Sequence, residues 1–454
     1  MPGISLAQKR VVANYSAAHV GREEIGSGAA GTVRMRVLFV GMISLLAVVA
    51  VGAAIAQAIR GAQALGATDA LVFQAAGRII AAHGCVYCVS TEGAAQLSLL
   101  GGHLQANGVE AFNNPPLIAW LVQPFAGMSL SVYTVLSVAI EAAALLVGIL
   151  MARRLLAGSI DLRLRLAVVG LALVAPLPGL ETLLFAQWVG LMLVALLGAY
   201  LLMRSNHAFS AGLALSVLLV KPQDIWLVPI VLLVARAWPT LLGLATGAAV
   251  WLLTSVLVVS GGTLAHLIGA LSQNQSQITF TDGLPGVATA IAGSEWGIVV
   301  AALGAAAALA AFPLRDRLRR DPMLALDIGI ALSLLFSPHV FGADLLLMGA
   351  VLVDVGRHNL RAAVVAALIL DVAYLVEASL FHTRGHLEAI ALLCATGVVI
   401  AVASLRQEAS LLGRAVRIVR SADALPARRV IGPAELMGHT QSATRLRLLS
   451  RSKP

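Results

Sequence analysis

Charged residues are scarce in this chain of 454 residues, because only 12% of them are Asp, Glu, Lys or Arg. Soluble globular proteins carry about 25%, so the composition excludes an ordinary soluble domain. Lysine is nearly absent: Lys9, Lys221 and Lys453 stand among 31 basic residues, and the rest are arginines. Together with abundant alanine, this bias indicates a bacterial genome rich in G and C.

Two familiar patterns are missing as well. No stretch shows the alternating hydrophobicity of a membrane β-barrel, so helices are the remaining way to span a bilayer. No glycine motif of the P-loop or Rossmann type is present. The sequence therefore shows no site for ATP or for a nucleotide-sugar donor.

Apolar residues make up 59% of the chain and occur in blocks long enough to cross a bilayer. We predict an all-α polytopic membrane protein with about 12 transmembrane helices. The first span is too long for a signal-peptide core and is interpreted as an uncleaved anchor. The predicted spans are 37–59, 131–151, 166–178, 188–203, 208–220, 225–235, 239–260, 297–312, 323–336, 341–355, 362–380 and 387–405.

The net charge of +9 could suggest nucleic-acid binding, but the basic residues flank apolar spans as membrane topology requires. With both termini in the cytoplasm of a bacterial inner membrane, only Arg60, Arg78, Lys221 and Arg384 fall on the extracytoplasmic side. This asymmetry depends on a hairpin that turns at Lys221. A single kinked helix over 208–236 would reverse everything downstream.

The predicted domain organisation has three parts. A cytoplasmic tail covers 1–36, the transmembrane domain covers 37–405, and a basic cytoplasmic tail covers 406–454, where anionic lipid would attract it. Two long extracytoplasmic loops are expected at 60–130 and 261–296. Semi-apolar stretches at 70–82 and 117–125 favour helices that lie at the membrane interface.

Asp69 follows the first span on the extracytoplasmic side. A carboxylate near a lipid boundary is costly unless it has a task or a partner, and Asp69 could act as a general base toward a hydroxyl. It could equally cap a helix with Thr68 or be a solvated loop residue. Weaker candidates on the same side are Glu181, Gln187, Asp282 and Glu295, whereas Glu141 and Asp327 fall within spans and suggest packing or ion pairs.

Three further breaks in apolar runs carry polar residues. Asn114 precedes two prolines, which could simply start a membrane helix. Lys221, followed by Pro222 and Gln223, could bind a lipid phosphate or form an ion pair with Asp224 or Glu181. His339 follows Ser337-Pro338 and precedes Asp344; it could contact a phosphate or a sugar hydroxyl, or serve a structural role.

The cysteines favour a structural role. Cys85 and Cys88 share one predicted outer loop, where a local disulfide is the simplest reading. A redox motif would need a βαβ unit, and a zinc site would need four ligands, which His83 and His103 would have to complete. Cys394 lies in an apolar run and is expected to be inert packing.

The order of these motifs resembles that of a known family. Asp69-x-x-Val72-Phe73 with Gly84-Cys85-Val86-Tyr87 is similar to its opening "D-x-x-V-Y … G-x-x-x-Y". Asn114-Pro115-Pro116 with Gln123-Pro124-Phe125 resembles its "Y-P-P … P-F/L", and Lys221-Pro222-Gln223 with Arg236-Ala237-Trp238 resembles its "K-P-Q … R-x-W". Ser337-Pro338-His339 is similar to a late "S-P … H" break. The family is membrane glycosyltransferase family 87 of the GT-C superfamily, and the resemblance covers about residues 37–405.

The resemblance implies a GT-C-type bundle and a mechanism. A sugar, with mannose expected, would move with inversion from a polyprenyl-phosphate donor to a glycolipid or glycan acceptor. Asp69 would be the general base. The donor phosphate would contact Lys221 and His339, with Gln223, Asn114 and Gln187 as further binding residues, and neither a metal nor a cofactor would be required. The chain departs from the family at Phe73 and Asn114, where tyrosine is usual, and at Gln187, which lacks the preceding glycine.

Other functions stay open at this point. An arabinofuranosyltransferase of the same family would share the motifs. A lipid or solute transporter would favour broken helices in two similar halves, and the sequence shows breaks without such halves. A non-catalytic envelope scaffold would not need Asp69. The membrane lipids are expected partners, nucleic acid is not, and the sequence does not indicate an oligomeric state.

Overall fold

The described residues form helices joined by loops, with no β-strand among them. The structure is a computed structural model that describes residues 69–103, 108–156, 177–258, 283–376, 387 and 389–402. The predicted spans at 37–59 and most of 166–178, both predicted tails and most of the 261–296 loop lie outside these residues. All described residues belong to one unit of the chain, which ends at Val402.

The helices follow the predicted spans closely. Two 3-10 turns extend short helices, η3 (Ser216–Val220) after α9 and η7 (Gly342–Leu345) before α17. An unlabelled helix covers Ala389–Val402. The labelled helices of this set are α5 (Leu130–Leu155), α8 (Val189–Arg204), α9 (Ala208–Leu215), α10 (Val228–Val234), α11 (Trp238–Val258), α14 (Ser294–Leu309), α16 (Pro322–Leu335), α17 (Leu346–Gly356) and α18 (Leu360–Val376).

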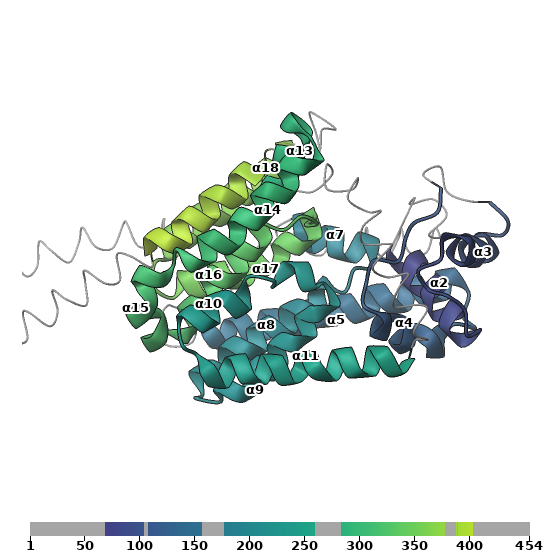
Figure 1. The fold of residues 1–454 in the computed structure, drawn as a ribbon, viewed down its shortest axis with the longest axis horizontal. Coiled ribbons are helices and arrows are strands. Elements are labelled where there is room, and N and C mark those ends of the chain that lie inside the picture. The colour runs from purple at the N-terminus through teal and green to yellow at the C-terminus, as the bar shows by residue number, and fades with distance from the viewer. Residues whose placement is uncertain are drawn as a thin grey trace, which may run out of the picture. The chain divides into compact units, whose positions relative to one another are not determined.

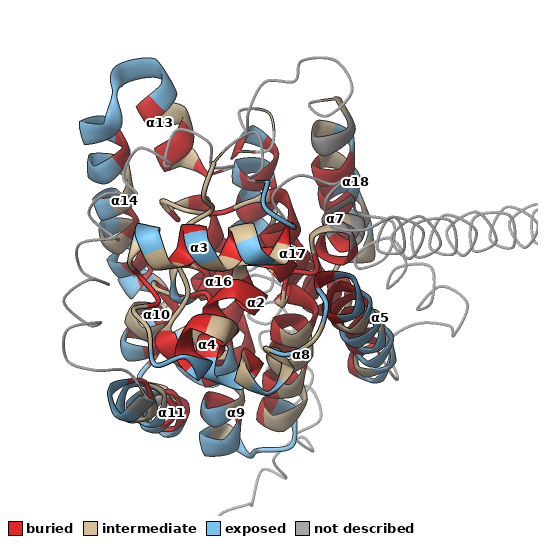
Figure 2. Cartoon of the chain, turned by 90° about the vertical axis from the view of Figure 1, so that its right-hand side faces the viewer, coloured by how far each residue is buried: buried red, intermediate tan, exposed pale blue. Residues whose placement is uncertain are grey.

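Three of the described segments are long and apolar enough to cross a membrane: α5, α11 and the run Ser294–Arg320, which continues α14 into α15 (Arg315–Arg320). They lie at the periphery, and most of their surface is exposed (Figure 2). Leu257 of α11 is 76% exposed. Large exposed apolar side chains of this kind suit lipid rather than water, and the protein is a membrane protein. The predicted total of 12 spans stays a prediction.

The centre of the bundle is formed by α16 and α17. Every residue of α17 is buried, and so is every residue of α16 except Pro322. A helix that is hydrophobic on all sides belongs in the interior of a bundle, and Figure 2 shows both helices enclosed by others. Tyr200 of α8 donates a hydrogen bond to Asp327 of α16 at 2.6 Å. Asp327 therefore accepts a hydrogen bond from a tyrosine, where packing or an ion pair was expected.

The chain reverses at Lys221, as the hairpin prediction requires. α9 and α11 run in the same direction, because Gly212 of α9 faces Thr240, whereas Gly247 of α11 faces Ser216 just after α9. α10 must therefore lead back between them. Gly212 and Gly243 lie where a Cβ atom would overlap the backbone of the other helix, so small residues allow this close approach.

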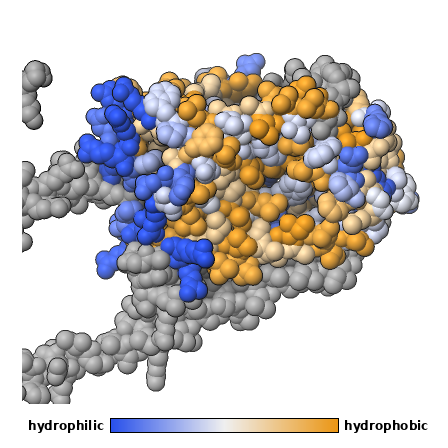
Figure 3. Space-filling view, turned by 90° about the horizontal axis from the view of Figure 1, so that it is seen from below, coloured by the Kyte–Doolittle hydropathy of each residue, from blue (hydrophilic) through white to orange (hydrophobic). Residues whose placement is uncertain are grey.

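The two ends of the bundle differ in chemistry. Arginines gather at one end, where α5, α8 and α15 finish; we call it the arginine end. It lies at the left in Figure 1, and on the face shown in Figure 3 a hydrophobic band separates it from the mixed right-hand end. The right-hand end holds α2 (Asp69–Ala81), α3 (Val89–Leu99) and α4 (Pro116–Val122), and we call it the cavity end.

Helices occupy both stretches for which interfacial helices were predicted, as α2 and as α4 with the 3-10 turn η2 (Gln123–Phe125). α2 is anchored by side chains. Gln74 donates to the Met128 carbonyl at 2.8 Å, and Arg78 donates to the Ala126 carbonyl at 2.9 Å. These bonds fix α2 against the loop that leads into α5. Whether the two helices lie at a membrane interface stays a prediction.

Candidate functional site

A cavity of about 270 Å³ opens at the cavity end. All six residues to which the family resemblance gave a catalytic or binding role line it: Asp69, Asn114, Gln187, Lys221, Gln223 and His339. They come from breaks that are far apart in the chain. The predicted common cavity of Asp69, Lys221 and His339 is therefore present, while the role of each residue stays a prediction. The remaining lining residues are Val72, Phe73, Glu110, Ala111, Asn113, Glu181, Phe185 and Phe341.

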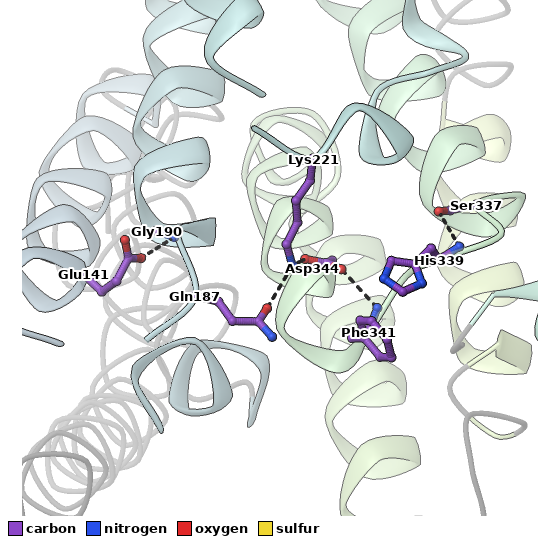
Figure 4. Close-up of polar contacts among 8 residues, drawn as sticks. All are labelled: Glu141, Gln187, Gly190, Lys221, Ser337, His339, Phe341 and Asp344. Carbon is purple, nitrogen blue, oxygen red and sulfur yellow. Dashed lines mark hydrogen bonds and ion pairs between the residues drawn. The ribbon is translucent and has the colours of Figure 1, made fainter. Parts of the chain in front are cut away.

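Lys221 occupies the break between η3 and the 3-10 turn η4 (Pro222–Asp224). Because a residue before proline is pushed out of the helical region, Pro222 ends the helix here, and Lys221 has φ −126° and ψ 82°. Its ammonium group donates to Asp344 Oδ1 at 2.6 Å and to Gln187 Oε1 at 2.9 Å (Figure 4). An ammonium group has three donors, and the described residues take up two of them, which leaves one that could bind a ligand.

The ion-pair partner of Lys221 is not one that the sequence suggested. Among the described residues, Lys221 forms its ion pair with the buried carboxylate of Asp344 and none with Asp224. Asp224 is also buried, and its two oxygens have no hydrogen-bond partner among the described residues. Asp224 and Asp344 are thus both buried near Lys221. The ion pair forms with Asp344, which is the more distant of the two in sequence.

The break after α16 positions His339. Ser337 Oγ accepts a hydrogen bond from the His339 backbone N–H at 3.2 Å, and Asp344 Oδ2 accepts one from the Phe341 N–H at 3.0 Å. The His339 and Phe341 rings meet edge-on at 4.7 Å. Burial lowers the pKa of His339 to about 4, the charge of Lys221 adds to this effect, and Asp344 opposes it. His339 is therefore a neutral hydrogen-bonding group at pH 7 in the unliganded site.

Gln187 is held by the start of α8. Ala186 has a positive φ of 53°, and the Gln187 N–H donates to the Thr182 carbonyl at 3.1 Å. Glu141 of α5 accepts a hydrogen bond from the Gly190 N–H at 2.7 Å (Figure 4), which satisfies a free donor of the helix N-terminus. A Cβ atom at residue 190 would overlap this carboxylate. Glu141 therefore caps α8 and fixes the turn that presents Gln187.

Asp69 is the first residue of α2 and faces the cavity while partly exposed. Burial raises its pKa to about 6 against the opposing charge of Lys221, and Asp344 and Glu110 add to the rise. One turn later, Phe73 packs against Phe112 and Trp188, with ring centroids 6.4 and 5.4 Å away. Thr68, the predicted partner in a helix cap, lies outside the described residues.

Ten of the lining residues can be divided into two groups by their chemistry and their place in the chain. We call Gln187, Lys221, Gln223, His339 and Phe341 the lysine wall, and Asp69, Glu110, Ala111, Asn113 and Asn114 the carboxylate wall. Hydrogen bonds through Asp344 connect most of the lysine wall. Phe73 of α2, the helix that begins at Asp69, contacts Trp188, the neighbour of Gln187. A fixed ammonium group in the same cavity as the carboxylates of Asp69 and Glu110 can bind an anion beside a proton acceptor.

The comparison with known families agrees with this arrangement. The family model "glycosyltransferase family 87" matches residues 112–338, which is half of the chain. The chain belongs to glycosyltransferase family 87. The resemblance drawn from the motifs is confirmed. No curated protein and no solved structure is a significant match.

The range matched by the family model includes some of the site residues and leaves out others. It includes Asn114, Gln187, Lys221 and Gln223, and it ends one residue before His339. Asp69 precedes the matched range, so its assignment rests on the motif that opens the outer loop and on its place in the cavity. As a family 87 member the protein is a membrane glycosyltransferase, which transfers a sugar from a donor to an acceptor.

Four residues of this glycosyltransferase site were missed or undervalued in the sequence. Glu110, Asn113 and Phe341 line the cavity, and Asp344 holds Lys221. Asp344 was visible only as a neighbour of the His339 motif, and Glu110 lay in a loop without a motif. Of the weaker candidates, Glu181 lines the cavity, Glu295 is exposed on α14 outside it, and Asp282 lies outside the described residues.

The cysteines of this family 87 member divide into a bridged pair and a free one. Cys85 and Cys88 form a disulfide with a Cα–Cα distance of 5.4 Å, which confirms the simplest of the predicted alternatives. His83 and His103 are exposed, and the described residues contain no group of three His, Cys, Asp or Glu side chains placed for a metal. Cys394 is exposed on the last helix; the expectation that it is packed inside was wrong.

Proposed function

We propose that this glycosyltransferase moves a sugar, with mannose the first expectation, from a polyprenyl phosphate to a hydroxyl group of a glycolipid or glycan acceptor. The observation that carries the proposal is the common cavity, into which an acidic side chain and a fixed ammonium group project from separate breaks. A sugar phosphate needs a contact for its leaving phosphate, and an acceptor hydroxyl needs a base. The two walls provide one of each.

Asp69 is the proposed general base. With a pKa near 6, it is mainly ionised at pH 7 and still basic enough to accept a proton, which suits acid–base catalysis. The acceptor oxygen forms a bond to the anomeric carbon from the face opposite the phosphate, so the configuration inverts. The bond between that carbon and the phosphate oxygen breaks, the electron pair leaves with the phosphate, and the hydroxyl proton passes to Asp69.

The lysine wall is the proposed phosphate site. The free donor of Lys221 and the imidazole N–H of His339 would bind the phosphate oxygens, with Gln187 and Gln223 beside them. Charge-assisted hydrogen bonds to a leaving oxygen strengthen as its negative charge grows. Since Asp344 and Gln187 already hold Lys221 in place, little conformational freedom would be lost when the donor binds. The proposed chemistry calls for no metal and no cofactor.

The orientation of the protein follows from its arginines. We place the arginine end in the cytoplasm, because basic residues concentrate on that side of inner-membrane proteins. The cavity end then faces the extracytoplasmic side, where a lipid-linked sugar is available and a nucleotide sugar is not. Both termini are cytoplasmic in this topology, and the polyprenyl chain would lie among the apolar helices.

The test is a transfer assay with purified full-length protein. It uses a panel of radiolabelled donors, polyprenyl-phospho-mannose and polyprenyl-phospho-arabinofuranose, and extracted bacterial membranes as acceptors. Label that appears in a lipid or glycan fraction from the mannose donor supports the proposal. Transfer from the arabinose donor alone would reassign the sugar. Absence of transfer from either, with folded protein, would contradict the polyprenyl-phosphate donor.

A further inference from the structure

We infer that Glu110 binds the acceptor, and that the sugar ring which carries the attacking hydroxyl is uncharged. This inference rests on the proposed function and concerns the acceptor side of the same cavity. Its basis is the segment Glu110–Asn114, which supplies most of the carboxylate wall. The segment has no regular secondary structure, yet buried side chains hold its backbone in place.

Four hydrogen bonds from side chains fix this segment. The Gln96 amide donates to the Glu110 carbonyl at 2.6 Å, and its oxygen accepts from the Glu110 N–H at 3.1 Å. Glu92 accepts from the Phe112 N–H at 3.1 Å, and the Tyr87 hydroxyl donates to the Asn114 carbonyl at 2.8 Å. Tyr87, Glu92 and Gln96 are themselves buried. A loop whose polar groups are satisfied in this way is ordered before any ligand arrives.

The fixed backbone directs three polar side chains at the cavity: Glu110, Asn113 and Asn114. The Glu110 carboxylate has no hydrogen bond or ion pair with any described residue, in contrast to the carboxylates of Asp344 and Glu92. An ionised carboxylate only accepts hydrogen bonds. Its natural ligand in this position is a hydroxyl donor, and a sugar ring offers several hydroxyls beside the one that Asp69 would deprotonate.

The charges around the cavity exclude an anionic acceptor ring. Asp69 and Glu110 line a space of about 270 Å³, and the positive charge of Lys221 is already matched by Asp344. The phosphate of the donor would add further negative charge. Next to Asp69 and Glu110, a carboxylate or phosphate on the acceptor ring would therefore meet like charges at short range, where repulsion is weakly screened. A neutral ring with several hydroxyls meets none.

The experiment compares two acceptors that differ only at C6: an octyl mannoside and its uronate. Full-length enzyme in mixed micelles receives radiolabelled polyprenyl-phospho-mannose, and kcat/KM is measured for each acceptor. We expect the neutral acceptor to exceed the uronate at least tenfold. In the Glu110→Gln variant, the KM for the neutral acceptor should rise about tenfold, as for the loss of one charged hydrogen bond, while the donor KM moves less than twofold.

Two further variants test the role of the loop backbone and serve as a control. Gln96→Leu leaves the Glu110 carboxylate in place but removes both bonds to its backbone, so the acceptor KM should rise again. Glu295→Gln changes an exposed carboxylate outside the cavity and should match wild type. Equal use of uronate and mannoside, or a wild-type acceptor KM for Glu110→Gln, would overturn the inference while transfer itself continues. Loss of transfer to membrane acceptors by wild type would instead count against the proposed function.

Discussion

The ammonium nitrogen of Lys221 lies 2.6 Å from Oδ1 of Asp344, a residue 123 positions further along the chain. The second oxygen of Asp344 accepts the Phe341 N–H. One carboxylate thus ties the helix break at Lys221 to the break that presents His339. Both residues of the pair are buried, so the geometry of the lysine wall depends on it.

Replacing one residue of this ion pair should therefore lower the stability of the protein more than replacing both. Lys221→Met leaves a buried carboxylate without compensation, which costs about 3–5 kcal/mol. Adding Asp344→Asn to Lys221→Met should recover most of that stability in thermal unfolding in detergent, because the uncompensated charge is gone. Transfer should stay lost in the double variant, since the phosphate contact is missing.

The control is the ion pair at the arginine end, where buried Asp354 and partly exposed Arg357 lie 2.5 Å apart. Asp354→Asn should lower the unfolding temperature without changing the donor KM. If the double variant at Lys221 and Asp344 regains transfer together with stability, Lys221 serves the fold and not the donor.

Asp69→Asn should reduce transfer by about 10²–10⁴-fold, the usual effect of losing a general base. The change is nearly isosteric, and an Asn caps a helix about as well as Asp, so expression and unfolding temperature should match wild type. The measurement is single-turnover transfer from polyprenyl-phospho-mannose at equal protein levels. Near-normal transfer would remove Asp69 as the base and make Glu110 and Glu181, which line the same cavity, the next carboxylates to test.

The rate of transfer should fall at low pH with an apparent pKa near 6. Asp69 must be ionised to accept a proton, and protonation below a pKa of about 6 removes the base, so the rate drops tenfold per pH unit further down. Asp344 raises the pKa of Asp69 by its negative charge. Asp344→Asn should consequently move the acid limb to lower pH, in addition to slowing transfer. If the acid limb of the pH–rate profile stays in place in a folded, active Asp344→Asn variant, a group other than Asp69 titrates.

The membrane orientation can be tested with two cysteines in a Cys394→Ser background, in which Cys85 and Cys88 stay bridged. Glu295→Cys at the cavity end should react with a membrane-impermeant maleimide in intact spheroplasts. Arg319→Cys at the arginine end should react only after lysis. Both positions are exposed, so access to the reagent depends on the side of the membrane. The reverse pattern would place the cavity in the cytoplasm.

The helices were largely predictable, because apolar length and flanking arginines follow directly from the cost of placing polar groups in lipid. The predicted span 131–151 became Leu130–Leu155, and 323–336 became Pro322–Leu335. The reversal at Lys221 was predictable from proline and from the arginine pattern. In a membrane protein, however, apolar residues on a helix face lipid as well as the core, and for that reason Cys394 was wrongly expected to be packed inside.

The contacts within the site were less predictable. Lys221 has acidic neighbours in sequence, and nothing in the pattern around it points to Asp344, because an ion pair between distant breaks depends on how the helices pack. Glu110 had no motif, since its position comes from Gln96 and Glu92 on another element. The sequence could thus name the breaks that carry chemistry, while the assignment of partners required the fold.

The hydrogen bonds that hold the Glu110–Asn114 segment affect how substrate specificity can change in such enzymes. Its backbone is supported by Tyr87, Glu92 and Gln96, none of which lines the cavity, so the residues that support the segment and those that face the ligand are different. Side chains at positions 110, 113 and 114 can be exchanged without loss of any of these hydrogen bonds. Substrate choice in descendants of this protein can therefore drift by single substitutions while folding stays intact, and the same three positions are where a designer would begin to retarget the enzyme.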